Sequence, residues 1–227
     1  PARCVHFAAA RKAWCSLSGM SHDAPLRCLC GEVSGQVTDA SSDHVNRVIC
    51  YCDDCQAFVH RLGRRELLDP HGGSDIIQVA PSSLRFDRGR ERIVGLRLSP
   101  TGLYRFYASC CNTPLGNAVG PKLPFVGIAA ACFTTKTGSI DDAFGPPIGK
   151  IQGKYAIGNP PAGSTGHNVR LLARTARLIF TWKLRGKSWP SPFFDKVSHA
   201  PLYPVSTLSQ TERDALRPFC GPKPTAT

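Results

Sequence analysis

The sequence predicts a mainly β fold. Glycine and proline, at 21 and 19 of the 227 residues, are slightly above average, which favours strands and turns over a helix bundle. Short β-like runs are separated by turn-forming residues. Seven of the eleven cysteines form three blocks, which are Cys28 and Cys30, then Cys50, Cys52 and Cys55, then Cys110 and Cys111. Pairs that are adjacent or two apart close disulfide rings poorly, so these blocks favour metal ligation.

Extended backbone is expected on both sides of Gly31. In residues 26–31 the thiols of Cys28 and Cys30 sit at strand spacing, on one side of the chain. Gly31 then allows a positive-φ turn that aims backbone N–H groups at sulfur. The apolar residues of 33–37 continue the extended pattern.

A short helix is expected directly after the second cysteine block. Its body is 56–59, and Asp53 or Asp54 can cap its N-terminus because short carboxylates accept bonds from free backbone N–H groups. Gly63 ends it, since glycine adopts the left-handed conformation that commonly follows a helix.

Further elements are expected where apolar runs lie between turn residues. They are strands at 75–79, 93–98 and 103–107, a small apolar run at 126–132, a Gly/Pro-rich connection at 145–166, and a helix at 167–187. This helix is amphipathic and basic, and we expect its apolar stripe to pack on its own domain rather than on a membrane. An extended arm with a few anchoring aromatic residues, including Phe193 and Phe194, follows.

The chain divides into three segments. Residues 1–19 precede the sole methionine, Met20, and are expected to be an extension outside the fold. Residues 20–160 form the domain with the cysteine blocks, and 161–227 form a basic helix and arm. The net charge of +12 is concentrated in the two outer segments, so a solvated basic face is favoured over a nucleic-acid site. No apolar run is long enough to span a bilayer, and unpaired cysteines favour a cytoplasmic location.

The second block, Cys50-Tyr51-Cys52-Asp53-Asp54-Cys55, predicts three sulfurs that converge on one point. Cys50 and Cys52 share one side of a strand, and a helical turn brings Cys52 and Cys55 together. Three soft ligands without a local fourth favour a zinc ion with an open position. Redox-active thiols are the alternative, because a Cys-x-x-Cys pair can also form an exchanging disulfide.

The three cysteine blocks resemble those of a known family. Cys28-Leu29-Cys30-Gly31-Glu32-Val33, the second block, and Cys111-Asn112-Thr113 after an aromatic strand are similar to the glutathione-dependent formaldehyde-activating enzymes, which include centromere protein V-like domains. The resemblance covers about residues 26–135 and is greatest to an uncharacterised bacterial branch. It implies a β-tent fold with two zinc ions, one structural and one catalytic.

By this resemblance Cys28, Cys30 and Cys111 match ligands of the structural zinc. Ala108 stands where the family has the remaining cysteine. Cys110 can replace that ligand only if the backbone bends, because neighbouring side chains on a strand point to opposite faces. A water or another residue is the alternative fourth ligand.

The resemblance also implies an activity. Zinc held by Cys50, Cys52 and Cys55 would activate glutathione or a similar thiol for addition to formaldehyde or a related electrophile, as in a carbon–sulfur lyase. Arg61 and Arg64 are candidates for binding the carboxylates of glutathione, or else are exposed helix-end charges. The other hypotheses are a binding module with structural zinc only and a nucleic-acid binder that uses the basic tail.

Four further residues lie inside or beside the cysteine blocks. Tyr51 and Asp53 can orient a bound water or substrate, or serve as a core aromatic and a helix cap. Asn112 and Thr113 can donate hydrogen bonds to sulfur, or simply make a turn.

Overall fold

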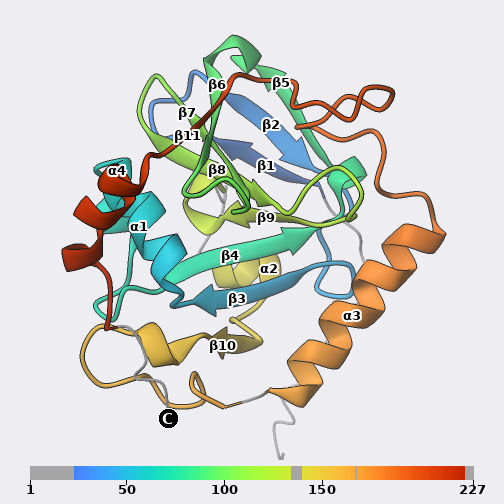
Figure 1. Cartoon of the computed structure of the whole chain (residues 1–227). Helices are drawn as coiled ribbons and strands as arrows, with labels where there is room; N and C mark the ends of the chain where they lie inside the picture. Colours follow the sequence, from blue (N-terminus) through green and yellow to red (C-terminus); the bar gives the residue numbers. More distant parts are fainter. Residues whose placement is uncertain (1–22, 134–139, 167, 223–227) are drawn as a thin grey trace, which may run out of the picture.

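The fold is mainly β, as the sequence predicts. The structure is a computed structural model that describes residues 23–133, 140–166 and 168–222. In these residues eight strands form a mixed sheet in the order β10-β3-β4-β9-β8-β7-β6-β11, and three form a second sheet in the order β1-β2-β5 (Figure 1). The strands are β1 Ala24–Arg27, β2 Ser34–Val37, β3 Asn46–Cys50, β4 Ser74–Val79, β5 Leu84–Arg88, β6 Ile93–Arg97, β7 Tyr104–Ala108, β8 Thr113–Ala118, β9 Val126–Ala129, β10 Gly149–Ile151 and β11 Val205–Thr207. The α-helices are α1 Asp53–Arg61, α2 Ile140–Phe144, α3 Val169–Leu184 and α4 Gln210–Ala215. The expected extension, 1–19, lies outside the described residues.

One large hydrophobic core joins the two sheets. Leu26 and Val37 of the small sheet belong to the same buried cluster as Ile77, Phe106 and Ile128 of the large sheet. Buried residues recur at alternate positions in several of these strands, such as Ala24 and Leu26 in β1, which places one side chain in two against the core. The intervening side chains of the large sheet face its other side, where α1 lies.

Strand β8 is an element that the sequence did not predict. Its residues include Pro114 and Gly116, which usually count against an interior strand. Pro114 is tolerated because it lies opposite Tyr107, where the register of β7 and β8 shifts at a bulge. Gly116 leaves room for the ring of Phe193, since a Cβ there would lie 2.9 Å from the Phe193 ring. Strands β5, β10 and β11 were likewise not predicted.

Helix α1 follows the second cysteine block, as predicted, but starts earlier than expected. Its N-cap is Cys52, whose sulfur accepts a hydrogen bond from the Cys55 backbone N–H at 3.4 Å. The expectation that Asp53 or Asp54 caps the helix is therefore wrong. Both residues lie in the first turn of the helix, where the positive end of the helix dipole stabilises their carboxylates. Gly63 follows the helix with a φ of 67°, as expected.

Helix α3 confirms the predicted amphipathic helix and buries one stripe. Leu178 and Trp182 form a small cluster with Ala80, against which Phe125 packs. Other large apolar side chains of this helix are exposed, namely Val169, Leu172, Phe180 and Leu184. Within the described part of the chain, no helix combines the length and the apolar character needed to cross a membrane.

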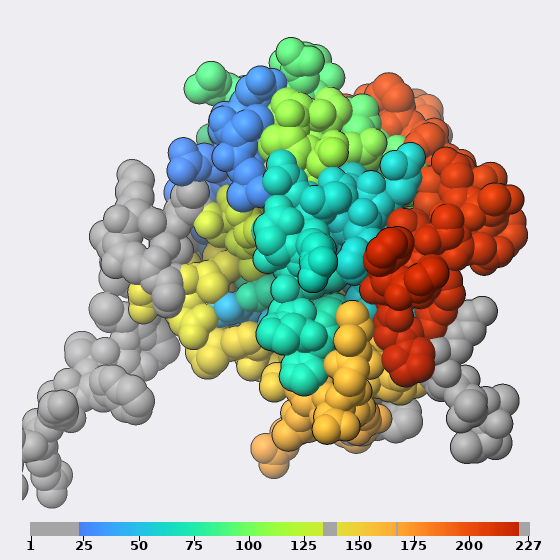
Figure 2. Space-filling view, turned by 90° about the vertical axis from the view of Figure 1, so that its left-hand side faces the viewer, coloured from blue at the N-terminus to red at the C-terminus, as the bar shows by residue number. Residues whose placement is uncertain are grey.

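The segment after α3 returns to the body of the protein. Phe193 and Phe194 enter the main core, where the rings of Phe193 and Phe106 stack with centroids 4.1 Å apart. Strand β11 then pairs with β6 in parallel. Figure 2 shows the C-terminal segment, in red, against the cyan segment that contains α1. The arm therefore anchors through its aromatic residues, as expected, and covers α1 as well.

Candidate metal centres

Four thiols gather at one end of the small sheet. The sulfur atoms of Cys28, Cys30, Cys110 and Cys111 all lie within 4.8 Å of one another. The Sγ atoms of Cys28 and Cys30 are 3.4 Å apart, and those of Cys30 and Cys110 are 3.3 Å apart. A tetrahedral site with zinc–sulfur bonds of about 2.3 Å has sulfur–sulfur edges of about 3.8 Å. The group thus has the donors and nearly the size that one tetrahedral zinc ion requires.

Two turns bring these thiols together. Gly31 adopts the predicted positive φ, 85°, in the turn between β1 and β2. Strand β7 ends at Ala108, so Cys110 and Cys111 lie in a turn rather than on a strand, and Asn112 has a φ of 54°. The bend needed for both thiols to face one point is therefore present. Ala108 itself is buried opposite Thr113 in the β7–β8 ladder.

Hydrogen bonds orient two of these sulfurs. The backbone N–H of Val33 donates to Cys28 Sγ at 3.3 Å. The Thr113 hydroxyl lies 3.0 Å from Cys111 Sγ and accepts from the backbone N–H of Leu29, which leaves its proton for the sulfur. Burial opposes the charge of Cys111, but hydrogen bonds, first of all with Thr113, lower its pKa to about 6. Thr113 thus supports the sulfur, while Asn112 forms the turn.

The thiols of Cys50, Cys52 and Cys55 form a second group. Cys50 ends β3, Cys52 caps α1, and Cys55 lies in the first turn of α1. Their sulfurs lie within 4.8 Å of one another, and the Sγ atoms of Cys50 and Cys55 are 3.8 Å apart. The predicted convergence is confirmed. In the described part of the chain, no fourth cysteine, histidine or carboxylate completes this group.

The pKa values of Cys50 and Cys55 are shifted in opposite directions. Hydrogen bonds from Cys50 and Cys52, helped by Arg105, hold the pKa of Cys55 well below its usual value. Hydrogen bonding to Cys52 and Cys55, together with burial, raises the pKa of Cys50 well above it. The first negative charge therefore falls on Cys55, which is the sulfur next to the arginine.

Arg105 is the main site residue that the sequence did not single out. Only 1 % of its surface is exposed, and its Nη1 lies 3.8 Å from Cys55 Sγ while its Nη2 lies 3.5 Å from the Asp54 carboxylate. Burial disfavours its charge, but Cys55, Cys52 and Asp54 outweigh burial and raise its pKa. The guanidinium also lies over the Phe58 ring of α1, 5.5 Å from the centroid. No local signal marked it, because an arginine that alternates with aromatic residues along a strand usually faces solvent.

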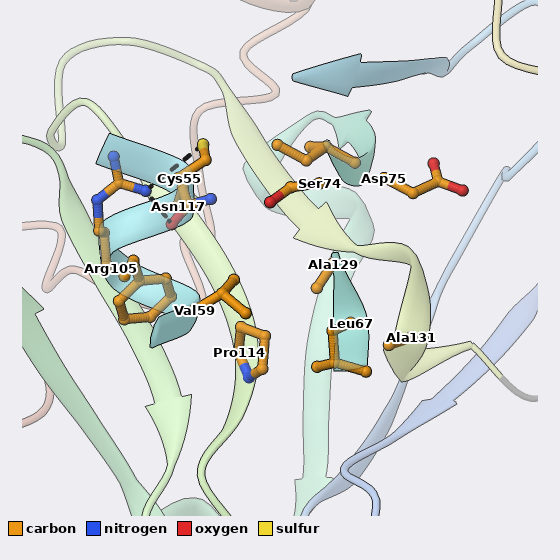
Figure 3. Close-up of a pocket in the computed structure, with 12 residues that line it drawn as sticks. Cys55, Val59, Leu67, Ser74, Asp75, Arg105, Pro114, Asn117, Ala129 and Ala131 are labelled. Carbon is orange, nitrogen blue, oxygen red and sulfur yellow. Dashed lines mark hydrogen bonds between the residues drawn. The ribbon is translucent and has the colours of Figure 1, made fainter. Parts of the chain in front are cut away.

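A pocket of about 50 Å³ lies beside Cys55 (Figure 3). Its polar lining comes from Arg105, Asn117, Ser74 and Asp75. The Asp75 carboxylate is bound by the Arg47 guanidinium, with Nη2 to Oδ2 at 2.7 Å, and points away from the others in Figure 3. The apolar lining includes Val59, Leu67, Pro114, Ala129 and Ala131. Cys55 is the member of the trio that lines this pocket.

The other predicted residues lie elsewhere. Arg64 donates to the carbonyl of Cys111, and Arg61 lines a separate pocket with Tyr107 and Glu212; neither lines the pocket beside Cys55. Their role in binding glutathione stays a prediction. Tyr51 is 1 % exposed and donates to Asp69 at 2.9 Å, which makes it a core residue. Asp53 forms ion pairs with Arg213 and Arg217, so it is neither the cap nor directed at the thiols.

Fold and site together define a mainly β protein with two cysteine groups, each able to hold a metal ion. The chain belongs to a family of unknown function (DUF6151), whose model matches residues 20–202. No curated protein matches the chain significantly. The matched range contains both cysteine groups, the pocket, and the aromatic residues of the arm.

Proposed function

We propose that the protein is a zinc-dependent, carbon–sulfur lyase-like enzyme that joins a small thiol to a small aldehyde. The observation that carries this proposal is the trio of thiols, which has no fourth protein ligand among the described residues and lies beside a pocket. A closed site of four thiols lies elsewhere in the same chain, so the two groups suit a structural and a reactive ion respectively. The cysteine blocks resemble those of the formaldehyde-activating family. This resemblance, together with the β-tent fold that it implies, supports the same conclusion.

The residues present fit zinc at the trio. All three donors are sulfur, and the 3.8 Å between Cys50 and Cys55 equals the edge of a zinc–thiolate tetrahedron, about 3.8 Å. Zinc supplies a positive charge that keeps a bound thiol deprotonated near neutral pH. Three thiolates leave the site with one excess negative charge, which the Arg105 guanidinium offsets at 3.8 Å from Cys55.

The reaction proposed is addition of a thiol to an aldehyde. The thiol sulfur forms a bond to the carbonyl carbon, the π electrons move to the oxygen, and the proton that the thiol lost returns to that oxygen through water. The product is a hemithioacetal, and the reverse reaction is the lyase direction. Glutathione is the thiol that the family resemblance indicates, with formaldehyde or a related electrophile as its partner.

Metal content and cobalt spectroscopy test this proposal. We expect two zinc ions per chain, falling to one in Cys28→Ser and to one in Cys55→Ser, with two retained in the control Cys220→Ser, whose thiol lies outside both groups. In cobalt-loaded protein, glutathione should shift the thiolate-to-cobalt absorption, and Cys52→Ser should abolish this shift.

Two outcomes contradict the proposal in different ways. Two metals without any response to glutathione identify a binding module with structural metals only. A chain that purifies without metal, and forms a disulfide between Cys52 and Cys55 on mild oxidation, identifies a redox pair instead.

A further inference from the structure

A second apolar stripe of α3 faces away from the protein. Its four large side chains are Val169, Leu172, Phe180 and Leu184, which are 70 %, 67 %, 63 % and 71 % exposed. Among the described residues, only Val197 is a more exposed large apolar side chain. Figure 1 shows α3, in orange, at the periphery of the molecule. The helix therefore carries apolar surface beyond the stripe that it buries on its own domain.

The exposed stripe occupies one face of the helix. At about 100° per residue its four side chains fall within an arc of about 120°, and the buried stripe lies on the opposite side. The buried side anchors the helix. Leu178 and Trp182 pack with Ala80, and Arg174 Nε donates to Asn46 Oδ1 at 2.7 Å. Because α3 is already folded and fixed, a partner that covers the exposed stripe does not have to order it first.

The surroundings of the stripe are basic. No aspartate or glutamate occurs in the sequence between Asp142 and Asp195, a segment that contains eight lysines and arginines. By helical position Arg170 and Arg177 border the stripe on one side and Lys183 lies within it, and all three side chains are exposed. Within the part of the chain that the structure describes, none of these three cations has an ion pair. The face thus combines apolar side chains with uncompensated positive charge.

We propose that this face of α3 binds the surface of an anionic lipid membrane, with the helix parallel to the surface. The apolar side chains enter the boundary between headgroups and acyl chains, where they leave water. The long side chains of Arg170, Arg177 and Lys183 extend to the level of the lipid phosphates, which pair with their charges. This surface is independent of the cysteine trio and of the reaction proposed there.

Charge and apolarity together favour a lipid surface over two other partners. A second copy of the chain would place one basic face against another, with no acidic residue of this segment to pair with it. A nucleic acid would match the cations, but its phosphates would lie against the apolar stripe and lose hydration without a partner there. An anionic bilayer offers both an apolar interior and negative headgroups.

Co-sedimentation of the zinc-loaded, full-length chain with lipid vesicles tests this proposal. We expect binding to vesicles of equal parts phosphatidylglycerol and phosphatidylcholine, and binding at least about tenfold weaker to phosphatidylcholine alone. Leu172→Ala combined with Phe180→Ala should lower the partition constant at least about tenfold, because less apolar surface leaves water. Arg170→Gln combined with Arg177→Gln should lower it by a similar factor and reduce its dependence on salt.

Matched controls replace residues outside the stripe. Val197→Ala removes an exposed apolar side chain, and Arg88→Gln with Arg90→Gln removes two exposed cations; each should change the partition constant less than about twofold. No binding to the anionic vesicles overturns the proposal, as does binding that survives the loss of Leu172 and Phe180. A dimer in analytical ultracentrifugation that the same double variant dissociates overturns it in favour of an interface between copies. Tighter binding to double-stranded DNA than to vesicles overturns it in favour of a nucleic-acid surface.

Discussion

At the scale of single residues, Arg105 determines the charge of the site. Its guanidinium stays protonated, as arginine side chains do in proteins, and it is almost completely buried. A buried cation requires anions, which here are the thiols of Cys55 and Cys52 and the carboxylate of Asp54. The buried guanidinium therefore favours the thiolate form of Cys55, whose pKa it helps to lower.

Replacing Arg105 should weaken metal binding at the trio. In Arg105→Met the side-chain length is kept and the positive charge beside the thiolates is lost. We expect zinc affinity at this site to fall about 10–100-fold, the usual effect of removing a group that supports metal ligands. Competition with a chromophoric chelator measures it, and Arg97→Met is the control, because Arg97 binds the Gly102 carbonyl and the Tyr104 ring instead. Equal affinities in both variants would contradict this role.

The sequence predicted the thiols of the site but not the arginine. Spacings of two and three residues fix which side each cysteine of 50–55 faces, so local geometry was sufficient. Arg105 lies in a strand of aromatic residues, where the same alternation is typical of a solvent-facing arginine. Its burial results from α1, whose Phe58 covers it from about fifty positions away in the chain. Local pattern carries no information on such a contact.

At the scale of elements, the end of the chain supports the helix that carries the trio. Asp53 in the first turn of α1 pairs with Arg213 and Arg217, and the Gly221 N–H donates to the buried Gln56 amide at 2.8 Å. The basic charges that the sequence assigns to a tail are thus used within the molecule at these positions. This contact fixes the start of α1, and with it Cys52 and Cys55.

A double-mutant cycle should detect this support. Asp53→Asn and Arg217→Gln, singly and together, remove an ion pair that is 3.2 Å long with both side chains three-quarters buried. We expect a coupling free energy of about 0.5–1 kcal/mol in urea unfolding, near the upper end for such pairs. The exposed pair Arg85–Asp87, also at 3.2 Å, is the control and should show no measurable coupling. Equal coupling in both cycles would mean that the end of the chain does not hold α1.

At the scale of the whole molecule, the arm belongs to the core. The sequence divides the chain after residue 160 because composition and charge change there, and it correctly assigns anchoring aromatic residues to the arm. It does not show where they anchor, since Phe193 stacks on Phe106 and occupies the space that Gly116 leaves. A contact between Phe106 and Phe193, which are far apart in the sequence, has no local signature, so composition alone suggests an appendage.

Truncating Phe193 should therefore destabilise the entire protein. Phe193→Ala removes a fully buried ring and leaves a cavity beside β7 and β8, which should lower the free energy of unfolding by about 3–5 kcal/mol. Phe180→Ala on α3 is the matched control, because that ring is 63 % exposed, and it should change stability by less than about 0.5 kcal/mol. Urea unfolding of zinc-saturated protein measures both. If the arm were an independent appendage, loss of Phe193 would leave the main transition unchanged, whereas a part of the core must shift that transition as a whole.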